Sequence, residues 1–169
     1  GRFIAFRSER NGGGLFVMEA TGENPRLLSD QGYNPAWSPD GRAIAFATEQ
    51  TITPFARTGG SQLWVVDVAK GDKRKLTNGD AMQPSWSPDG RRIAVWSVDG
   101  GRRLLKTIAA DGGAMTPVFP SDANVTYWNP LWAPDGKWMY FGSNESGVLA
   151  LGRVPINAQG EATGPREAI

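Results

Sequence analysis

Hydrophobic and polar positions recur along this chain in a fixed order. An apolar segment ends in Trp, a polar Ser/Ala-Pro-Asp-Gly turn follows, and an alternating apolar segment comes next. Three complete copies run 34–46, 83–95 and 129–141, and residues 1–6 match the second half of a fourth copy. The turn glycines stand at positions 1, 41, 90 and 136, which gives spacings of 40, 49 and 46 residues. Periods of this length indicate a repeat architecture whose units cannot bury their own faces alone.

The Pro-Asp-Gly segment predicts a tight hairpin in each copy. Pro presets φ at the second position of a type I turn, Ser and Asp bond the local backbone, and Gly takes the left-handed position that follows. Apolar segments on both sides favour two antiparallel strands joined by this turn. We therefore assign structural roles to the repeated residues. The tryptophans pack between units: Trp37, Trp86 and Trp132. The other repeated residues form the turns: Asp40, Gly41, Asp89, Gly90, Asp135 and Gly136.

The second strand of each repeat has one bulky face and one small face. The bulky faces carry Ile4 and Phe6, Ile44 and Phe46, Ile93 and Val95, and Met139 and Phe141. The small faces carry Ala5, Ala45 and Ala94, and then Tyr140 in the last copy. Two apolar faces predict a sheet that is covered on both sides, with each bulky face filling the shallow face of the next sheet. Tyr140 predicts a different neighbour for the last sheet.

Two further strands complete each repeat. We expect third strands at 15–20, 63–68, 104–109 and 148–154, and fourth strands at 26–28, 74–76, 115–119 and 166–169. Four antiparallel strands in meander order make one blade of a β-propeller, and no helix signal interrupts the pattern. The sequence thus predicts an all-β propeller segment with blades at 1–30 (partial), 31–78, 79–121 and 122–169. Because the chain opens inside a repeat, we expect it to be part of a longer propeller.

The repeats resemble a known family. They follow the pattern Asn-Pro-x-Trp-Ser-Pro-Asp-Gly-x-x-Ile-Ala-Phe, and the second copy continues with Leu-Trp-Val-Val-Asp and Lys-Leu-Thr. Over essentially the whole chain this is similar to the Pro-Asp (WD40-like) repeats of TolB-type β-propellers. The resemblance implies six or more blades, a bacterial periplasmic or cell-surface location, and binding of protein partners. It also leaves a second possibility, because the family includes propellers fused to prolyl-oligopeptidase-like or other hydrolase domains.

Composition excludes several kinds of chemistry. The chain has 18 Lys plus Arg and 17 Asp plus Glu, so no electrostatic footprint for nucleic acid is present. It contains no Cys and no His, which excludes thiol nucleophiles, a Ser-His-Asp triad and most transition-metal sites within these residues. No apolar run is long enough for a membrane span. We predict no catalytic residue, no metal and no cofactor in this chain.

Meander order fixes which loops meet. The turns within the hairpins and those between third and fourth strands should emerge at one end, here called the turn end. The loops between second and third strands and those between blades should emerge at the other, the variable-loop end. The longest loop, 49–61, lies there. Polar residues on the variable loops of a rigid scaffold favour binding, although plain solvated loops are the alternative. Candidate partner-binding residues at this end are Arg10, Phe55, Arg57, Asp80 and Tyr127.

The first strand of each complete repeat begins with an amide, at Asn34, Gln83 and Asn129. These amides could form a ring at the mouth of the central channel, open to a peptide. The structural alternative, which we favour, is that each amide bonds backbone at the junction between blades.

The predicted function is a non-catalytic scaffold that binds a protein or peptide through the variable-loop end. The alternative is the propeller of a hydrolase whose catalytic domain lies outside this chain. A chain of four blades also exposes one bulky face and one unlike face. We therefore expect head-to-tail self-association, most simply as a ring of two copies.

Overall fold

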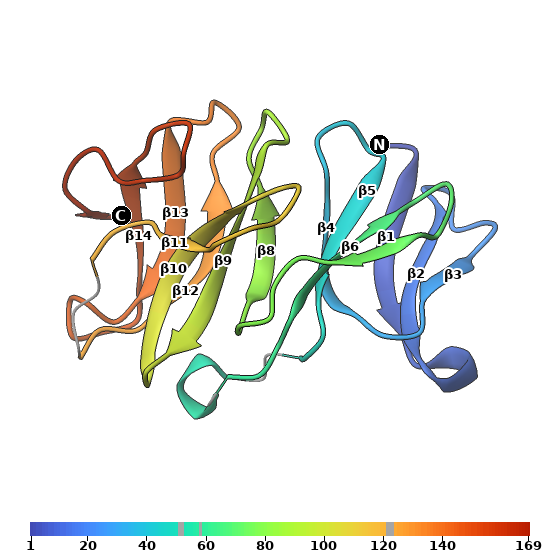
Figure 1. The fold of residues 1–169 in the computed structure, drawn as a ribbon, viewed down its shortest axis with the longest axis horizontal. Helices are drawn as coiled ribbons and strands as arrows, with labels where there is room; N and C mark the ends of the chain where they lie inside the picture. The colour runs from blue at the N-terminus through green and yellow to red at the C-terminus, as the bar shows by residue number, and fades with distance from the viewer. Residues whose placement is uncertain (51–52, 58, 121–123) are drawn as a thin grey trace.

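The computed structural model describes residues 1–50, 53–57, 59–120 and 124–169, and it contains four antiparallel sheets arranged side by side (Figure 1). Blade 1 has three strands, β1 (Phe3–Ser8), β2 (Gly14–Glu19) and β3 (Arg26–Ser29). Blade 2 comprises β4 (Tyr33–Trp37), β5 (Ala43–Ala47), β6 (Leu63–Asp67) and β7 (Lys73–Lys75). Blade 3 comprises β8 (Met82–Trp86), β9 (Arg92–Asp99), β10 (Arg102–Ala109) and β11 (Thr116–Pro117). Blade 4 comprises β12 (Tyr127–Trp132), β13 (Trp138–Ser143), β14 (Ala150–Pro155) and β15 (Glu167–Ala168). Each sheet is a meander, so the prediction of all-β propeller blades is confirmed.

A few element bounds differ from those predicted. The third strand of blade 4 begins at Ala150 rather than at 148, and the fourth strands β11 and β15 are only two residues long. Two short 3₁₀ helices, η1 (Arg10–Gly12) and η2 (Pro54–Ala56), interrupt loops in which no helix was expected. Each is a single turn, which is too short to give a helical period in the sequence. The boundary predicted between blades 3 and 4, at 121/122, lies outside the described residues.

The hairpin turns have the predicted conformation. Gly41, Gly90 and Gly136 have φ of 70°, 72° and 71°, the left-handed region that glycine enters without strain. In the first turn the Ser38 hydroxyl donates to Asp40 Oδ1 at 2.7 Å and accepts from the backbone N–H of Ala43 at 3.0 Å. The turn is therefore held by its own side chains.

The predicted stacking of bulky on small faces is confirmed at all three junctions. Ile44 and Phe46 of blade 2 share a core cluster with Leu15 and Val17 of blade 1, against which Ala5 packs. At the next two junctions Ile93 and Val95 pack with Ala45 and Leu63, and Met139 and Phe141 with Ala94 and Leu105. Because each blade covers its predecessor, the core is a series of layers rather than one centre.

Arginines in the fourth strands tie neighbouring blades together. Arg26 of blade 1 donates to the carbonyl of Val68 in blade 2. Arg74 of blade 2 donates to the carbonyls of Ala110 and Asp111 in blade 3, both at 2.9 Å. Carbonyls just after the third strands of blades 2 and 3 are thus satisfied from the preceding blade.

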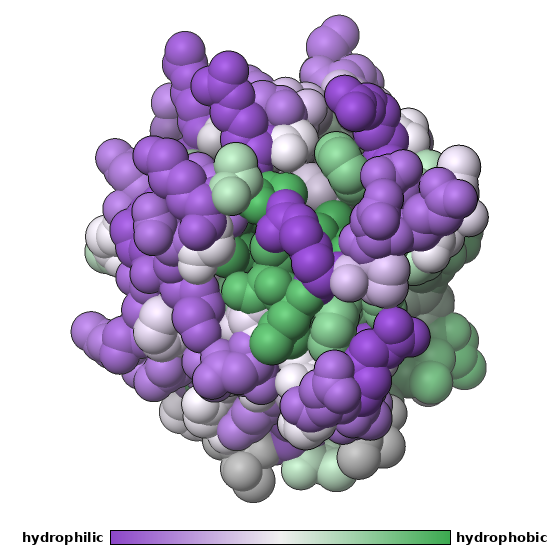
Figure 2. All heavy atoms as spheres, turned by 90° about the vertical axis from the view of Figure 1, so that its right-hand side faces the viewer, coloured by the Kyte–Doolittle hydropathy of each residue, from purple (hydrophilic) through white to green (hydrophobic). Residues whose placement is uncertain are grey.

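Two blade faces have no neighbouring blade in the described structure. Figure 2 shows the outer side of blade 1, where an apolar patch is surrounded by polar residues. Phe3, Ile4 and Leu27 are exposed on this blade, and the guanidinium of Arg10 lies over the rings of Phe6 and Phe16 at 5.8 and 5.7 Å. The face of blade 4 is different: Leu131, Tyr140, Arg153 and Glu167 lie in one cross-strand row, and Arg153 forms an ion pair with Glu167 at 2.8 Å.

Loops emerge at the two ends as the meander predicts (Figure 1). The hairpin turns lie at the top of the view and η1 and η2 at the bottom, so the bottom is the variable-loop end. Among the described residues, neither helical segment approaches the length or apolar character needed to cross a membrane.

Candidate partner-binding end

The first strands of three blades form a groove. Strands β4, β8 and β12 are the first strands of blades 2, 3 and 4, and they lie next to one another. Each contributes its Asn/Gln-Pro-x-Trp segment to a groove of about 470 Å³, here called the inner groove. Residues that are 46 to 49 positions apart in the sequence therefore line one continuous surface.

The amides at the start of these strands occupy an unusual backbone conformation. Asn34, Gln83 and Asn129 have φ of 52°, 46° and 52°. Each lies in a register irregularity of its hairpin, between the pairs Tyr33–Ala47 and Ala36–Ala45 in blade 2 and at the matching places in blades 3 and 4. Asn tolerates the left-handed region better than most residues, and a bulge re-aims the side chain beside it. The repeated Asn/Gln-Pro step thus marks a β-bulge.

The amides line the inner groove, and among the described residues the side chain of Gln83 makes a hydrogen bond that differs from our expectation. Gln83 Oε1 accepts from the indole Nε1 of Trp96 at 2.6 Å, a side chain of its own blade rather than backbone at a junction. Asn34 and Asn129 are exposed along the groove. Two of the three amides are therefore accessible from the channel side.

A buried ion pair anchors the long loop of blade 2. Arg57 donates to both carboxylate oxygens of Asp80, from Nη1 at 2.8 Å and from Nη2 at 2.6 Å. The two side chains are 9% and 5% exposed. Asp80 also accepts from the backbone N–H of Ser61 at 2.9 Å and of Val98 at 2.7 Å. One carboxylate thus joins the loop, the link between blades 2 and 3, and strand β9.

Arg57 has further partners that strengthen this arrangement. It pairs with Glu49 at 2.9 Å, and its guanidinium lies 5.3 Å from the ring centre of Trp96. Burial lowers the pKa of the Arg57 guanidinium, but the hydrogen bonds to Asp80 and Glu49 outweigh burial and hold that pKa above its ordinary value. Arg57 is charged and engaged inside the protein, so its effect on a partner would be to position the loop.

The anchored loop reaches across blade 3 to blade 4. Arg103 of β10 donates to the carbonyl of Phe55 at 2.7 Å and to that of Arg57 at 3.1 Å. The ring of Phe55 meets Trp128 of β12 edge-on, with centroids 5.7 Å apart. Phe55 is 44% exposed. Trp128 directly precedes Asn129, so this aromatic pair lies at the variable-loop end of β12.

The structure separates the predicted candidates into three groups. Asn34 and Asn129 are exposed along the inner groove, and Phe55 is exposed at the variable-loop end. Arg57, Asp80 and Gln83 hold the surrounding structure through the bonds described above. Tyr127 is fully buried among core side chains, and Arg10 lies over the outer face of blade 1. Trp128 does not recur in the repeats, and its sequence position left a core role and an exposed role open. Arg103 was missed because it lies within a predicted third strand with no signal for a contact to the 49–61 loop.

At the turn end, the aspartates of the first two hairpin turns are held by local hydrogen bonds. The pKa of Asp40 and of Asp89 is held below its ordinary value, chiefly by hydrogen bonds from the Ser38 and Ser87 hydroxyls. Backbone N–H groups of Arg42 and Arg91 add to this effect. These carboxylates bond their own turns, which agrees with the structural role predicted for them.

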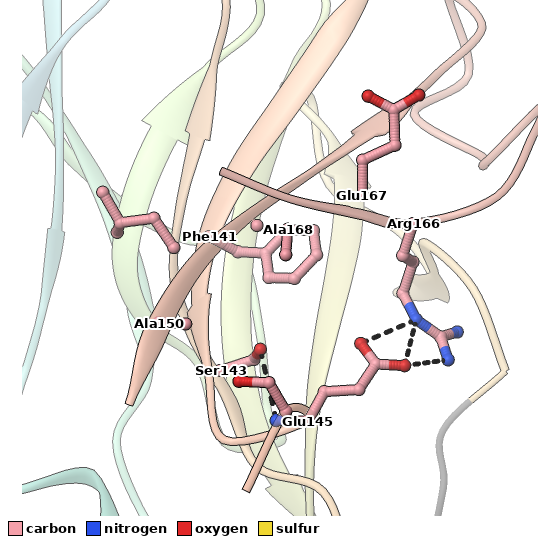
Figure 3. A pocket seen from close by; sticks show the side chains of 10 residues that line it. Phe141, Ser143, Glu145, Ala150, Arg166, Glu167 and Ala168 are labelled. Carbon is pink, nitrogen blue, oxygen red and sulfur yellow. Dashed lines mark hydrogen bonds and ion pairs between the residues drawn. The ribbon is translucent and has the colours of Figure 1, made fainter. Parts of the chain in front are cut away.

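A smaller cleft of about 160 Å³ lies in blade 4, and Figure 3 shows its walls. Small side chains at Ala150 and Ala168 leave space beside the ring of Phe141. At one side Arg166 donates to Glu145 Oε1 from Nε at 3.0 Å and from Nη2 at 2.5 Å. The Arg166 guanidinium also lies 4.9 Å from the ring centre of Phe119 of blade 3. The charged groups at this cleft are already paired, so we interpret it as part of the junction between blades.

Residues 31–163 match the TolB beta propeller domain. The chain belongs to this family. The match spans most of blades 2 to 4, including all three complete repeats, so the resemblance inferred from the repeats is confirmed.

Solved structures of TolB proteins and of enzymes share the fold. Putative TolB from Agrobacterium tumefaciens superposes with a TM-score of 0.80 at 22% identity, covering 99% of this chain and 61% of that protein. TolB from Acinetobacter baumannii gives 0.74 at 20% identity, covering 98% and 41%. A structure from a study of two prolyl endopeptidases gives 0.69 at 18% identity, covering 100% and 27%. This TolB-type chain therefore spans less than two thirds of each of these proteins.

Proposed function

We propose that this TolB-type propeller chain is a non-catalytic scaffold that holds a protein or peptide partner at its variable-loop end. In keeping with the TolB family, we place it in an extracytoplasmic compartment of a bacterium. The observation that carries the proposal is the exposed Phe55 ring, which contacts Trp128 at the variable-loop end.

The contacts that hold Phe55 and Arg57 in place support binding rather than simple solvation. Phe55 is an aromatic side chain, the type most enriched among the residues that dominate binding energy. Its backbone is held by Arg103, and the neighbouring Arg57 is held by the buried carboxylate of Asp80. A preorganised loop loses little entropy on binding. A solvated loop without a partner would need neither the buried ion pair nor the clamp on its carbonyls.

The accessible groups indicate the chemistry of the partner. Exposed amides at Asn34 and Asn129 offer both donors and acceptors to a backbone that runs along the inner groove. Phe55 and Trp128 offer an apolar contact at the variable-loop end. An extended peptide with an apolar or aromatic anchor residue matches this combination.

The test uses peptides selected for binding to the 169-residue chain from a displayed random library. Dissociation constants are then compared for the parent, Phe55→Ala and Asp40→Asn. We expect Phe55→Ala to weaken binding about thirtyfold, the effect of losing one dominant contact of about 2 kcal/mol. Asp40→Asn, at the turn end, should change binding less than twofold. The reverse order of effects would place the site at the turn end.

The second candidate function is that of a hydrolase propeller. It is favoured by the shared fold with the prolyl endopeptidase structure, in which this chain matches 27% of the length. In that case the variable-loop end would face a catalytic domain carried elsewhere in the parent polypeptide. Labelling of the full-length protein by a fluorophosphonate probe would support this function, and a parent sequence without a nucleophile domain would exclude it.

A separate proposal concerns self-association of the chain. Exposed apolar side chains lie on the outer face of blade 1 at Ile4 and Leu27 and on blade 4 at Leu131 and Leu151. The two faces are unlike, so contact between copies would be head-to-tail. Tyr140 and the Arg153–Glu167 ion pair on blade 4 make this contact bulkier and more polar than the three internal junctions, where bulky faces meet small ones.

A further inference from the structure

The amide group of Gln83 has a fixed orientation. Its Oε1 accepts from the indole Nε1 of Trp96 at 2.6 Å, and Trp96 is fully buried. An indole N–H can only donate, so the end of the amide that faces it must be the carbonyl oxygen. Turning the amide over would set an NH2 group against this N–H and leave a buried donor without an acceptor. Trp96 therefore determines which end of the Gln83 amide is left for another partner.

The remaining end is a donor at the surface of the inner groove. Gln83 is half-buried and lines that groove. Its Nε2 has no hydrogen-bond partner in the part of the chain that the structure describes, and it does not belong to the buried atoms that lack one. Nε2 is therefore accessible and unpaired. Because an amide NH2 group carries two N–H bonds and no acceptor, this position of the groove can only donate.

Gln83 holds its side chain in place at a conformational cost. Its φ of 46° lies in the left-handed region, as do the φ values of 52° at the matching residues Asn34 and Asn129. Asn enters that region more readily than most residues, so a bulge alone would favour Asn at position 83. Backbone strain of this kind persists where the surrounding contacts hold it, and it is concentrated at functional sites.

The neighbouring strand explains why blade 3 uses a longer amide. Six residues after the turn glycine, blade 3 has Trp96, whereas blade 2 has Ala47 and blade 4 has Gly142. Neither Ala nor Gly has a side-chain donor, so the amides of blades 2 and 4 have no corresponding indole to orient them. Gln is one methylene longer than Asn, and in blade 3 this longer side chain reaches the indole. Blade 3 thus replaces an adaptable amide by an oriented one.

The lining of the inner groove favours a neutral acceptor opposite this donor. Among the described residues, none that lines the groove is charged. The lining consists of amides, prolines, tryptophans and small or aliphatic side chains. A carboxylate placed there would lose its hydration without gaining a cation, whereas a carbonyl group loses far less. The group that matches Nε2 is therefore a carbonyl oxygen.

We propose that Gln83 is a specificity-determining residue of the inner groove, where its Nε2 donates to a main-chain carbonyl of an extended peptide. This inference rests on the proposed function, from which it takes the peptide partner. Gln83 lies in β8, which contacts both β4 and β12, so it faces the middle of the bound segment.

A donor that cannot turn over selects the register of the peptide. Along each edge of an extended chain, N–H and C=O groups alternate. Asn34 and Asn129 have no side-chain partner within the described residues, so their amides can present either a donor or an acceptor. Gln83 can present only N–H, so a carbonyl of the peptide must lie opposite it.

The experiment compares dissociation constants of the library-selected peptides for the parent chain, Gln83→Glu and Gln83→Met. Glu has the shape of Gln, and one carboxylate oxygen can still accept from the Trp96 indole, but the other oxygen replaces the Nε2 donor by an acceptor. We expect Gln83→Glu to weaken binding at least about tenfold. The indole N–H signal of Trp96 in ¹⁵N NMR spectra should stay at a hydrogen-bonded shift. Gln83→Met removes the donor without adding a charge and should weaken binding about fivefold.

Gln159→Glu is the matched control for the added charge, because Gln159 is exposed at the turn end, and it should leave the affinity unaltered. Parent-like affinity in Gln83→Met, or in Gln83→Glu with the indole signal retained, overturns the inference and leaves Gln83 a structural residue. Failure of the proposed function gives a different result: no peptide is selected, or Phe55→Ala binds as tightly as the parent.

Discussion

Removing Asp80 should destabilise the chain more than any other change of a charged residue at the variable-loop end. Its carboxylate receives four hydrogen bonds, two from Arg57 and one each from the N–H groups of Ser61 and Val98. Both members of the ion pair are at most 9% exposed. Breaking a buried ion pair from one side costs about 3–5 kcal/mol, because the remaining charge has lost its partner.

Arg57→Ala and Asp80→Ala should lower the free energy of unfolding by different amounts. Arg57→Ala leaves Asp80 with its two backbone donors, so this variant should lose about 3 kcal/mol of stability. Asp80→Ala also leaves the N–H groups of Ser61 and Val98 without an acceptor, so this variant should lose about 5 kcal/mol of stability. For a chain of this length each kcal/mol lowers Tm by about 2–4 °C. Asp80→Ala should therefore lower Tm by roughly 10–20 °C.

The assay is a double-mutant cycle by urea denaturation. The double variant should cost less than the sum of the singles by about 1–3 kcal/mol, since no unpaired charge remains buried. Glu49→Ala serves as control, because that carboxylate is 47% exposed and its pairing with Arg57 contributes under about 1 kcal/mol. Additive single effects, or a Glu49→Ala cost equal to that of Asp80→Ala, would refute the role given to this pair.

Four further predictions concern packing, turns and association. Trp86→Ala should cost about 3 kcal/mol in chemical denaturation, through loss of a half-buried indole and its bond to blade 2, and an unchanged midpoint would contradict the packing role. Gly142→Ala should displace Trp128, because the new Cβ would lie 2.5 Å from its ring; tryptophan fluorescence should change, and Phe55 should become more accessible to solvent. Ser38→Ala should raise the pKa of Asp40 measured by NMR. Since the folded pKa is depressed, the stabilisation from this carboxylate is present above the unfolded pKa of about 4 and is lost as pH falls through the folded value, a loss that Ser38→Ala should reduce. Light scattering should show that the mean mass rises with concentration, and a concentration-independent monomer would contradict association through the open blade faces.

The repeat pattern by itself determined the fold of this chain. Pro-Asp-Gly turns require local backbone geometry that only a few residues supply, so the hairpins could be placed from sequence. In segments such as Ile-Ala-Phe, bulky residues alternate with small ones. This alternation determined which face of each blade covers the next, because a strand presents successive side chains to opposite sides. The residues that establish these features recur at each period, and recurrence made them visible.

The candidate site was decided by tertiary structure. The 49–61 loop could be recognised by its length, but its path to Trp128 depends on a carboxylate that lies between two blades and on a clamp from Arg103. Such contacts join single residues far apart in the chain, and the described parts of the other repeats do not repeat them. Sequence reasoning placed Arg57 and Tyr127 on the binding surface because polar and aromatic residues in loops are usually exposed. Burial instead depends on which neighbouring blade covers them, and that is a property of the assembled sheets alone.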